Sequence, residues 1–170
     1  MTNPISLLTF RISQQRLALP IDKVREVIRN VPVMPAPAWT GLLHGIIHIR
    51  GMVIPVMDLR LVLGSEPSID TSKTRIVIVE MLERSAGFIV DEVDDIIPLK
   101  QEQLIPLSSL SWEKKTAVLV GIAQIEEQIY LVLDMDYLIR EEERKVFQEL
   151  CLKLQQNPME ITKKVEKEKL

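Results

Sequence analysis

Two histidines in the first half of the chain have the spacing of a metal-binding pair. His44 and His48 are four residues apart, which is the spacing of two zinc ligands on one face of a helix. The residues between them are Gly-Ile-Ile, which favour a strand and include no glutamate. A structural zinc also needs about four ligands, and cysteine and histidine are scarce in this chain. The sequence therefore predicts no zinc site.

Acidic residues cluster in the second half of the chain, at Asp91, Glu92, Asp94 and Asp95. Carboxylates are the ligands that calcium prefers, but this segment lacks the glycine turn and the ligand spacing of a calcium-binding loop. We interpret the cluster as a solvated strand edge. No metal and no cofactor are expected.

The remaining candidates for catalysis fit structural roles. Asp58, Asp134 and Asp136 follow apolar runs, which is typical of caps at strand exits rather than of an acid/base pair. Cys151 has no histidine near it in the sequence and is expected to pack rather than to act as a nucleophile. The sequence contains no phosphate loop, dinucleotide fingerprint or nucleophile elbow. We expect no catalytic residues and a protein that is not an enzyme.

The composition favours packing and surface contact. Aromatic residues make up only 4% of the 170 residues, although catalytic pockets and base-stacking platforms usually depend on them. The net charge is −3 and the basic residues are scattered, so nucleic acid is not an expected partner. The single cysteine, with no leader and no apolar run long enough to cross a bilayer, predicts a cytoplasmic chain.

Alternating apolar residues predict an all-β chain of hairpins. The hairpins are expected at Ser6–Ile21, Leu43–Met57, Arg75–Val90 and Ala117–Leu133. Asp58 is expected to cap a helical turn over Leu59–Leu63. Prolines make residues 32–39 a stiff connection, and residues 100–115 form a long polar segment. Apolar residues at helical spacing predict a C-terminal amphipathic helix.

The strand pattern occurs twice, which indicates a duplicated unit. A shift of 69 residues places SLLTFRI from Ser6 on RIVIVEM from Arg75. A shift of 76 residues places GIIHIRGMVIPVMDL from Gly45 on GIAQIEEQIYLVLDM from Gly121. One such match could arise by chance between any two half-buried hairpins, but several in the same order favour duplication. Each repeat has about the content of a five-stranded β-barrel, so two barrels are expected.

Three segments of the first half carry a family resemblance. They are IDKVREVI from Ile21, GIIHIRG from Gly45 and VIPVMDLR from Val53. In this order they resemble the CheW family of coupling proteins of bacterial chemotaxis. The resemblance implies two SH3-like β-barrels around a shared hydrophobic interior and an adaptor role. It also implies two partners, the CheW-like regulatory domain of the histidine kinase CheA and the cytoplasmic tip of methyl-accepting chemoreceptors.

The resemblance sets the expected domain organisation. A CheW-like domain covers residues 6–139, with one repeat over about 6–63 and the other over about 75–138. The C-terminal helix is expected over 140–157 and a charged, flexible tail over 158–170. One departure is visible, because the family usually has Asn before Leu-Arg-Gly and this chain has His48 and Ile49. That difference points to a variant partner set, for example in a type IV pilus or surface-sensing pathway.

Six residues are predicted to bind proteins: Val24, Glu26, Val27, His48, Arg50 and Gly51. Arg50 lies at a hairpin turn, and its counterpart in the second repeat is Glu126, so the scaffold does not require arginine there. We favour a contact role for Arg50 over a simple surface position, since arginine is enriched at binding hot spots. For Glu26 an exposed binding strand and a solvated face are equally good interpretations. Gly51 is explained most simply by a positive φ.

Two functions from different classes follow. The first is a non-catalytic adaptor that couples a CheA-type histidine kinase to chemoreceptor-like sensors in chemotaxis or surface-motility signalling, recruited to membrane receptor arrays through its partners. The alternative is a small β-barrel enzyme or ligand-binding protein with a site between the two halves.

Overall fold

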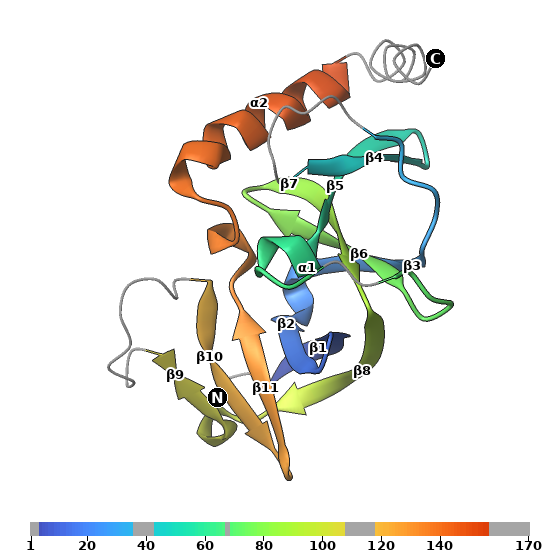
Figure 1. The fold of residues 1–170 in the computed structure, drawn as a ribbon. Coiled ribbons are helices and arrows are strands. Elements are labelled where there is room, and N and C mark those ends of the chain that lie inside the picture. Colours follow the sequence, from blue (N-terminus) through green and yellow to red (C-terminus); the bar gives the residue numbers. More distant parts are fainter. Residues whose placement is uncertain (1–3, 36–42, 67–68, 108–117, 157–170) are drawn as a thin grey trace.

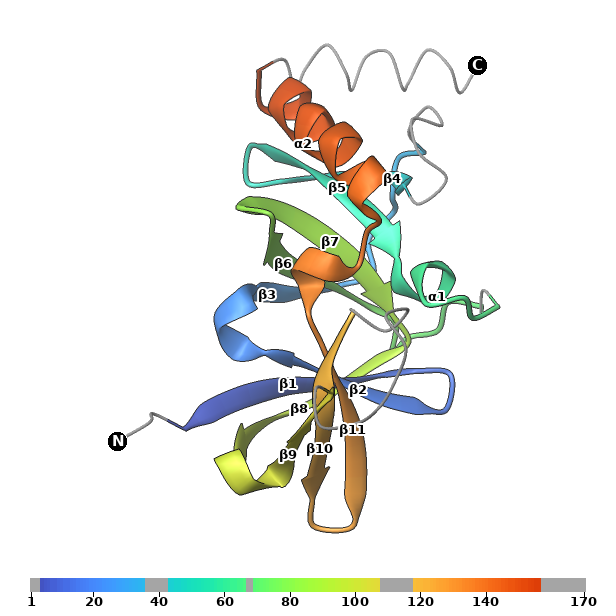
Figure 2. The same cartoon turned by 90° about the vertical axis from the view of Figure 1, so that its left-hand side faces the viewer.

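Two β-sheets lie one above the other, and a helix covers the upper one (Figures 1 and 2). The structure is a computed structural model that describes residues 4–35, 43–66, 69–107 and 118–156. The sheets form two SH3-like β-barrels, as the family resemblance implies, and the chain is mostly β.

Barrel 1 is the five-stranded sheet and barrel 2 is the six-stranded sheet. In spatial order, the strands of barrel 1 are β3 (Val24–Arg29), β6 (Arg75–Met81), β7 (Arg84–Val90), β5 (Met52–Asp58) and β4 (Leu43–Ile49). Those of barrel 2 are β8 (Glu92–Leu99), β1 (Ile5–Ile12), β2 (Gln15–Pro20), β11 (Gln128–Leu133), β10 (Leu119–Ile125) and β9 (Leu104–Pro106). The short helices are η1 (Ile21–Lys23), α1 (Leu59–Val62), η2 (Gln101–Gln103) and η5 (Met135–Tyr137).

Each barrel takes one hairpin from the other repeat. The β1–β2 hairpin of the first repeat lies in barrel 2, and the β6–β7 hairpin of the second repeat lies in barrel 1. The expectation that each repeat supplies its own barrel is therefore wrong. In each barrel the exchanged hairpin pairs on both sides with strands of the other repeat: β1 with β8 and β2 with β11 in barrel 2, and β6 with β3 and β7 with β5 in barrel 1. These partners are far apart in sequence, so apolar alternation within one strand carries no information about them.

The main apolar core lies between the two barrels. It contains Phe10 and Leu17 from barrel 2 together with Val77 and Phe88 from barrel 1, all of them fully or almost fully buried. Smaller clusters fill the inside of each barrel. The shared interior that the family resemblance implies is present, and it makes the stability of each barrel depend on the other.

Both barrels repeat one close approach of backbone to glycine. Met34 forms an isolated bridge with Ile46 of β4, and in barrel 2 strand β9 pairs with β10 in the equivalent place. A Cβ built on Gly45 would lie 2.2 Å from the Met34 oxygen, and one built on Gly121 would lie 2.4 Å from the Ile105 oxygen. The polar segment that the sequence leaves irregular therefore contains a short strand.

The C-terminal helix α2 (Glu141–Gln156) covers the outer face of the β4–β5 hairpin (Figure 2). Leu150 and Leu154 pack there against Ile46, so the predicted amphipathic helix is confirmed. The predicted tail over 158–170 lies outside the described residues. Within the described ranges, no helix is both long enough and apolar enough to span a membrane.

Candidate protein-binding surface

Strand β3 and the β4–β5 turn bring the central predicted residues together. The Arg50 Nη1 and the Glu26 Oε2 lie 3.0 Å apart and form an ion pair. The Arg50 side chain is 77% exposed, whereas that of Glu26 is 25% exposed. Because β3 and β4 lie at opposite ends of the strand order of barrel 1, this ion pair joins the two ends. We call Glu26, Arg50 and the exposed Val27, which follows Glu26 and faces the other side of β3, the β3 edge surface.

The backbone of the β4–β5 turn is left-handed at both central residues. Arg50 has φ 50° and Gly51 has φ 78°, as in the two-residue turns that match the twist of a hairpin. The positive φ expected at Gly51 is confirmed. Glu126, the counterpart of Arg50 in the second repeat, has φ 57°. The scaffold therefore fixes the conformation at this position and leaves its charge free to differ.

The other predicted residues have different surroundings. Val24 is half-buried and packs against the core between the barrels. His48 and His44 are exposed on β4. In the described ranges, no group of three or more His, Cys, Asp or Glu side chains is placed to hold a metal. The structure thus places Glu26, Val27 and Arg50 on the surface and Val24 under it.

Equivalent cross-strand pairs in the two barrels have reversed charges. Arg11 on β1 pairs with Asp94 on β8 at 3.0 Å, and Glu80 on β6 pairs with Arg25 on β3 at 3.5 Å. The shift of 69 residues places Arg11 on Glu80 and Arg25 on Asp94. The hydrogen bond with Asp94 raises the pKa of the Arg11 guanidinium. Duplicated positions have kept the pairing and exchanged its signs, so each sign of charge lies on the opposite strand of the pair in the two barrels.

An apolar groove lies where the chain passes from barrel 2 to barrel 1. Its volume is about 600 Å³, and its lining includes Ile5 from β1, Ile21 from η1, Val120 from β10 and Met135 from η5. We call it the junction groove. The groove is not visible in the sequence, because its lining comes from four elements that the fold brings together.

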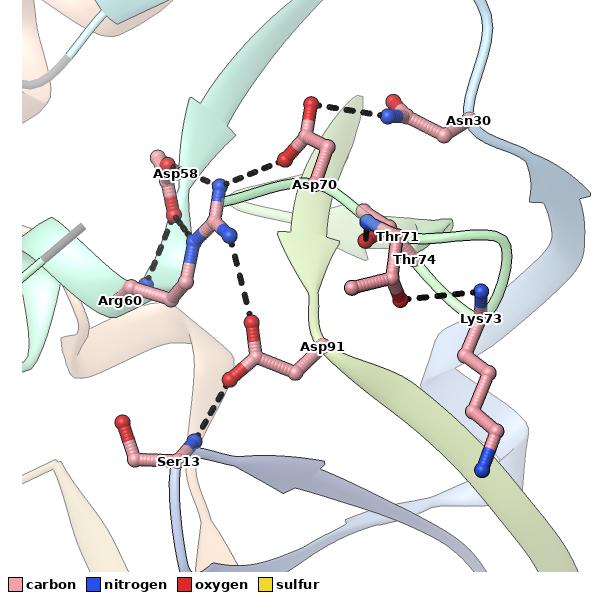
Figure 3. Close-up of polar contacts among 9 residues, drawn as sticks. All are labelled: Ser13, Asn30, Asp58, Arg60, Asp70, Thr71, Lys73, Thr74 and Asp91. Carbon is pink, nitrogen blue, oxygen red and sulfur yellow. Dashed lines mark hydrogen bonds and ion pairs between the residues drawn. The ribbon is translucent and has the colours of Figure 1, made fainter. Parts of the chain in front are cut away.

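A buried polar cluster lies beneath the surface at α1 (Figure 3). Arg60, which is 3% exposed, donates from Nε and Nη2 to the two carboxylate oxygens of Asp58, each at 2.8 Å. It also donates from Nη1 to Asp91 at 3.2 Å and from Nη2 to Asp70 at 3.1 Å. Hydrogen bonding to Asp58 is the main reason that the pKa of Arg60 is raised. We call these four residues the Arg60 cluster.

The Arg60 cluster corrects one interpretation and confirms another. Asp91 is not part of a solvated edge, because its side chain is 22% exposed and is held by Arg60. Asp58 caps α1, as expected, by accepting from the Arg60 backbone N–H at 3.0 Å. Sequence reasoning missed Arg60 itself. Its neighbour Asp58 was visible, but Asp70 and Asp91 reach it only through the fold.

Cys151 lies on the buried face of α2 and packs into the core between the barrels. Burial raises the pKa of its thiol to about 11, so the thiol stays protonated near neutral pH. A protonated, buried thiol is a poor nucleophile, which agrees with the packing role expected from the sequence.

Comparison with known proteins decides the family. The model of the CheW-like domain matches residues 6–143. The chain belongs to this family. A chemotaxis protein CheW from Thermotoga maritima is 30% identical, covering 79% of this chain and 87% of the relative. Protein PilI from Pseudomonas aeruginosa is 33% identical, covering 59% of this chain and 58% of the relative. The crystal structure of the scaffolding protein TtCheW from Thermoanaerobacter tengcongensis aligns with a TM-score of 0.74 at 30% identity, covering 80% of this CheW-like chain and 92% of TtCheW.

Proposed function

We propose that this chain is a non-catalytic adaptor that couples a CheA-type histidine kinase to chemoreceptor-like sensors in chemotaxis or surface-motility signalling. Membership of the CheW-like family carries the proposal. The adaptor works in the cytoplasm and reaches membrane receptor arrays through its partners. It contributes no chemistry of its own. By binding two partners at once it raises their effective concentration for each other.

The β3 edge surface is assigned to the kinase. The proposed partner is the CheW-like regulatory domain of the kinase, itself a β-barrel, and an edge strand with an adjacent turn suits such a partner. The exposed Val27 offers apolar contact, while Glu26 and Arg50 offer one charge of each sign. Apolar anchors supply most binding energy and charges set selectivity.

The junction groove is assigned to the receptor tip, which is a helical hairpin in the family. An apolar groove suits the apolar face of a helix. Ile5 and Val120 remain partly exposed in the groove, and the charged side chains of Asp22 and Lys23 lie beside them. The two partners would then bind different surfaces, which an adaptor requires.

The test is co-elution of the purified chain with a CheA-type regulatory domain and with a receptor tip. Arg50→Glu should abolish co-elution with the kinase domain and keep that with the receptor. Val120→Asp should do the reverse. Ile129→Asp is the matched control, since Ile129 is an exposed aliphatic residue outside the groove. Failure of the wild-type chain to bind either partner, together with saturable binding of a small molecule, would overturn the adaptor and favour the ligand-binding alternative.

The likeness to PilI supports a second candidate pathway, in surface motility rather than swimming. Co-elution with kinases of the two pathway types, run in parallel, distinguishes them. A kinase from the matching pathway should bind at least about tenfold more tightly, which corresponds to roughly 1.4 kcal/mol.

A further inference from the structure

We propose that Arg60 is a positioning residue for the β3 edge surface, holding the end of β3 in a fixed place relative to barrel 2. The role of β3 in binding rests on the proposed function, whereas the positioning itself is a property of the free chain. Two chains of hydrogen bonds start at the buried guanidinium, and each ends in a different barrel (Figure 3). We call each chain of hydrogen bonds an arm.

The first arm reaches β3. Arg60 Nη2 donates to Asp70 Oδ1 at 3.1 Å, and the other oxygen of Asp70 accepts from Asn30 Nδ2 at 2.9 Å. Asn30 directly follows Arg29, the last residue of β3. The arm therefore links α1 to the end of the strand that carries Glu26.

The second arm reaches barrel 2. Arg60 Nη1 donates to Asp91 Oδ1 at 3.2 Å, and Asp91 Oδ2 accepts from the Ser13 backbone N–H at 2.6 Å. Ser13 lies in the β1–β2 turn with φ 54°. The Asp91 backbone N–H also donates to the Arg11 carbonyl oxygen at 3.1 Å. Both the backbone and the side chain of Asp91 are therefore bound to barrel 2.

The chemistry of guanidinium explains why the arms are coupled. Its donors lie in one rigid plane, and the bidentate contact with buried Asp58 fixes the orientation of that plane. The positions of Asp70 and Asp91 are then set by the same planar group. A lysine would supply the charge without the planar fork.

The second repeat shows that the scaffold alone does not need this arrangement. The counterpart of Arg60 is Asp136, and the counterpart of Ser13 is Leu82. Asp136 Oδ1 accepts directly from the Leu82 backbone N–H at 3.0 Å. Both repeats therefore need a carboxylate that accepts a hydrogen bond from a backbone N–H of the hairpin turn. The link through arginine to Asp70 and Asn30 is added on the side of barrel 1, where the β3 edge surface lies.

The arm to β3 can be broken at two positions outside the buried core, the exposed Asp70 and the half-buried Asn30. Asp70→Ala removes its central carboxylate, whose side chain is 52% exposed. Asn30→Ala breaks the same arm without a change of charge. Glu66→Ala is the control, because it removes an exposed carboxylate from the same connection between α1 and β6.

Two measurements decide the proposal. Both arm variants should speed amide hydrogen exchange at the end of β3 about tenfold and weaken binding of the kinase regulatory domain about five- to tenfold, since local opening governs both. Glu66→Ala should change neither rate nor affinity, and urea midpoints should stay close to wild type. Unchanged exchange in both arm variants overturns the positioning role. Faster exchange with unchanged affinity overturns its part in binding. If the wild-type chain does not bind the kinase domain, the proposed function fails, while exchange still decides whether Arg60 positions β3.

Discussion

At the scale of residues, the ion pair of Glu26 and Arg50 is exposed enough to serve binding and contributes little to folding. Exposed ion pairs contribute roughly 0–1 kcal/mol, because water competes for both charges and two long side chains lose freedom. With its arginine 77% exposed, this pair belongs to that class. Removal of this ion pair should therefore lower the affinity for the partner and leave the free energy of unfolding almost unchanged.

Reversal of the charge at residue 50 tests that separation. Arg50→Glu should change the free energy of unfolding by no more than about 1 kcal/mol and weaken the kinase complex at least tenfold. Urea unfolding and titration calorimetry measure the two effects. The double variant Glu26→Arg with Arg50→Glu restores an ion pair of opposite direction. The double variant should still bind the kinase weakly if the partner contacts these two side chains. Recovery of its affinity would mean that binding needs only an ion pair at this place, in either direction. If Arg50→Glu alone unfolds the chain, Arg50 has a structural role instead.

Cys151 makes stability depend on pH in the alkaline range. Burial raises the thiol pKa from 9.0 to about 11. Between these values the unfolded chain has lost the proton and the folded chain keeps it, so stability is full below pH 9 and falls as pH rises towards 11. The fall should reach about 2 kcal/mol, on top of contributions from other groups. Urea unfolding at about pH 8 and about pH 10.5 should show a steeper loss for wild type than for Cys151→Ala; equal slopes would contradict the assignment.

At the scale of elements, each barrel depends on a glycine that lets another segment pass close to a strand. The carbonyls of Met34 and Ile105 occupy the space where a side chain at Gly45 or Gly121 would begin. The duplication kept both glycines, although the passing segment is an isolated bridge in one barrel and strand β9 in the other. Steric fit at these crossings therefore explains the matched residues better than backbone flexibility does.

Alanine at these crossings should be costly. Gly45→Ala forces the Met34 carbonyl away and should destabilise the chain by about 2 kcal/mol or more, as overpacking does. Gly64→Ala is the control, since Gly64 has φ 76° with open space where a Cβ would lie, and the change should cost only about 1 kcal/mol of backbone strain. Urea unfolding of both variants compares them. A smaller loss of unfolding free energy for Gly45→Ala than for Gly64→Ala would show that the Met34 segment moves away from the new side chain at little cost.

At the scale of the whole molecule, the exchanged hairpins make the two barrels one folding unit. Barrel 1 lacks β6 and β7 without the second repeat, and barrel 2 lacks β1 and β2 without the first. The core between them also draws on both. Neither repeat contains a complete sheet, so cooperative unfolding is the physical consequence.

Separated repeats should therefore fail to fold. A chain of residues 1–66 should show an unfolded circular dichroism spectrum and narrow amide dispersion, because β3 loses its partner β6 and the β4–β5 hairpin loses β7. Mixing it with residues 69–170 should restore β structure. Independent folding of the first fragment would contradict the importance of the exchange.

Sequence alone determined the features that depend on near neighbours in the chain. Alternation gave the hairpins, Asp58 gave the cap of α1, and the turn at Arg50 and Gly51 followed from the need for a positive φ. The repeat indicated two barrels, because duplicated patterns preserve the side-chain faces of equivalent strands.

Tertiary structure alone decided which strands share a barrel, where the junction groove lies and what Arg60 contacts. The contact between Arg60 and Asp91 spans 31 residues, and that between Asn30 and Asp70 spans 40. Strand β9 forms only because β10 lies beside it. Such contacts depend on chain closure over long distances, which the periodicity of a single strand cannot encode. Glu26 and Arg50 of the β3 edge surface were therefore visible in the sequence, and the ion pair between them was not.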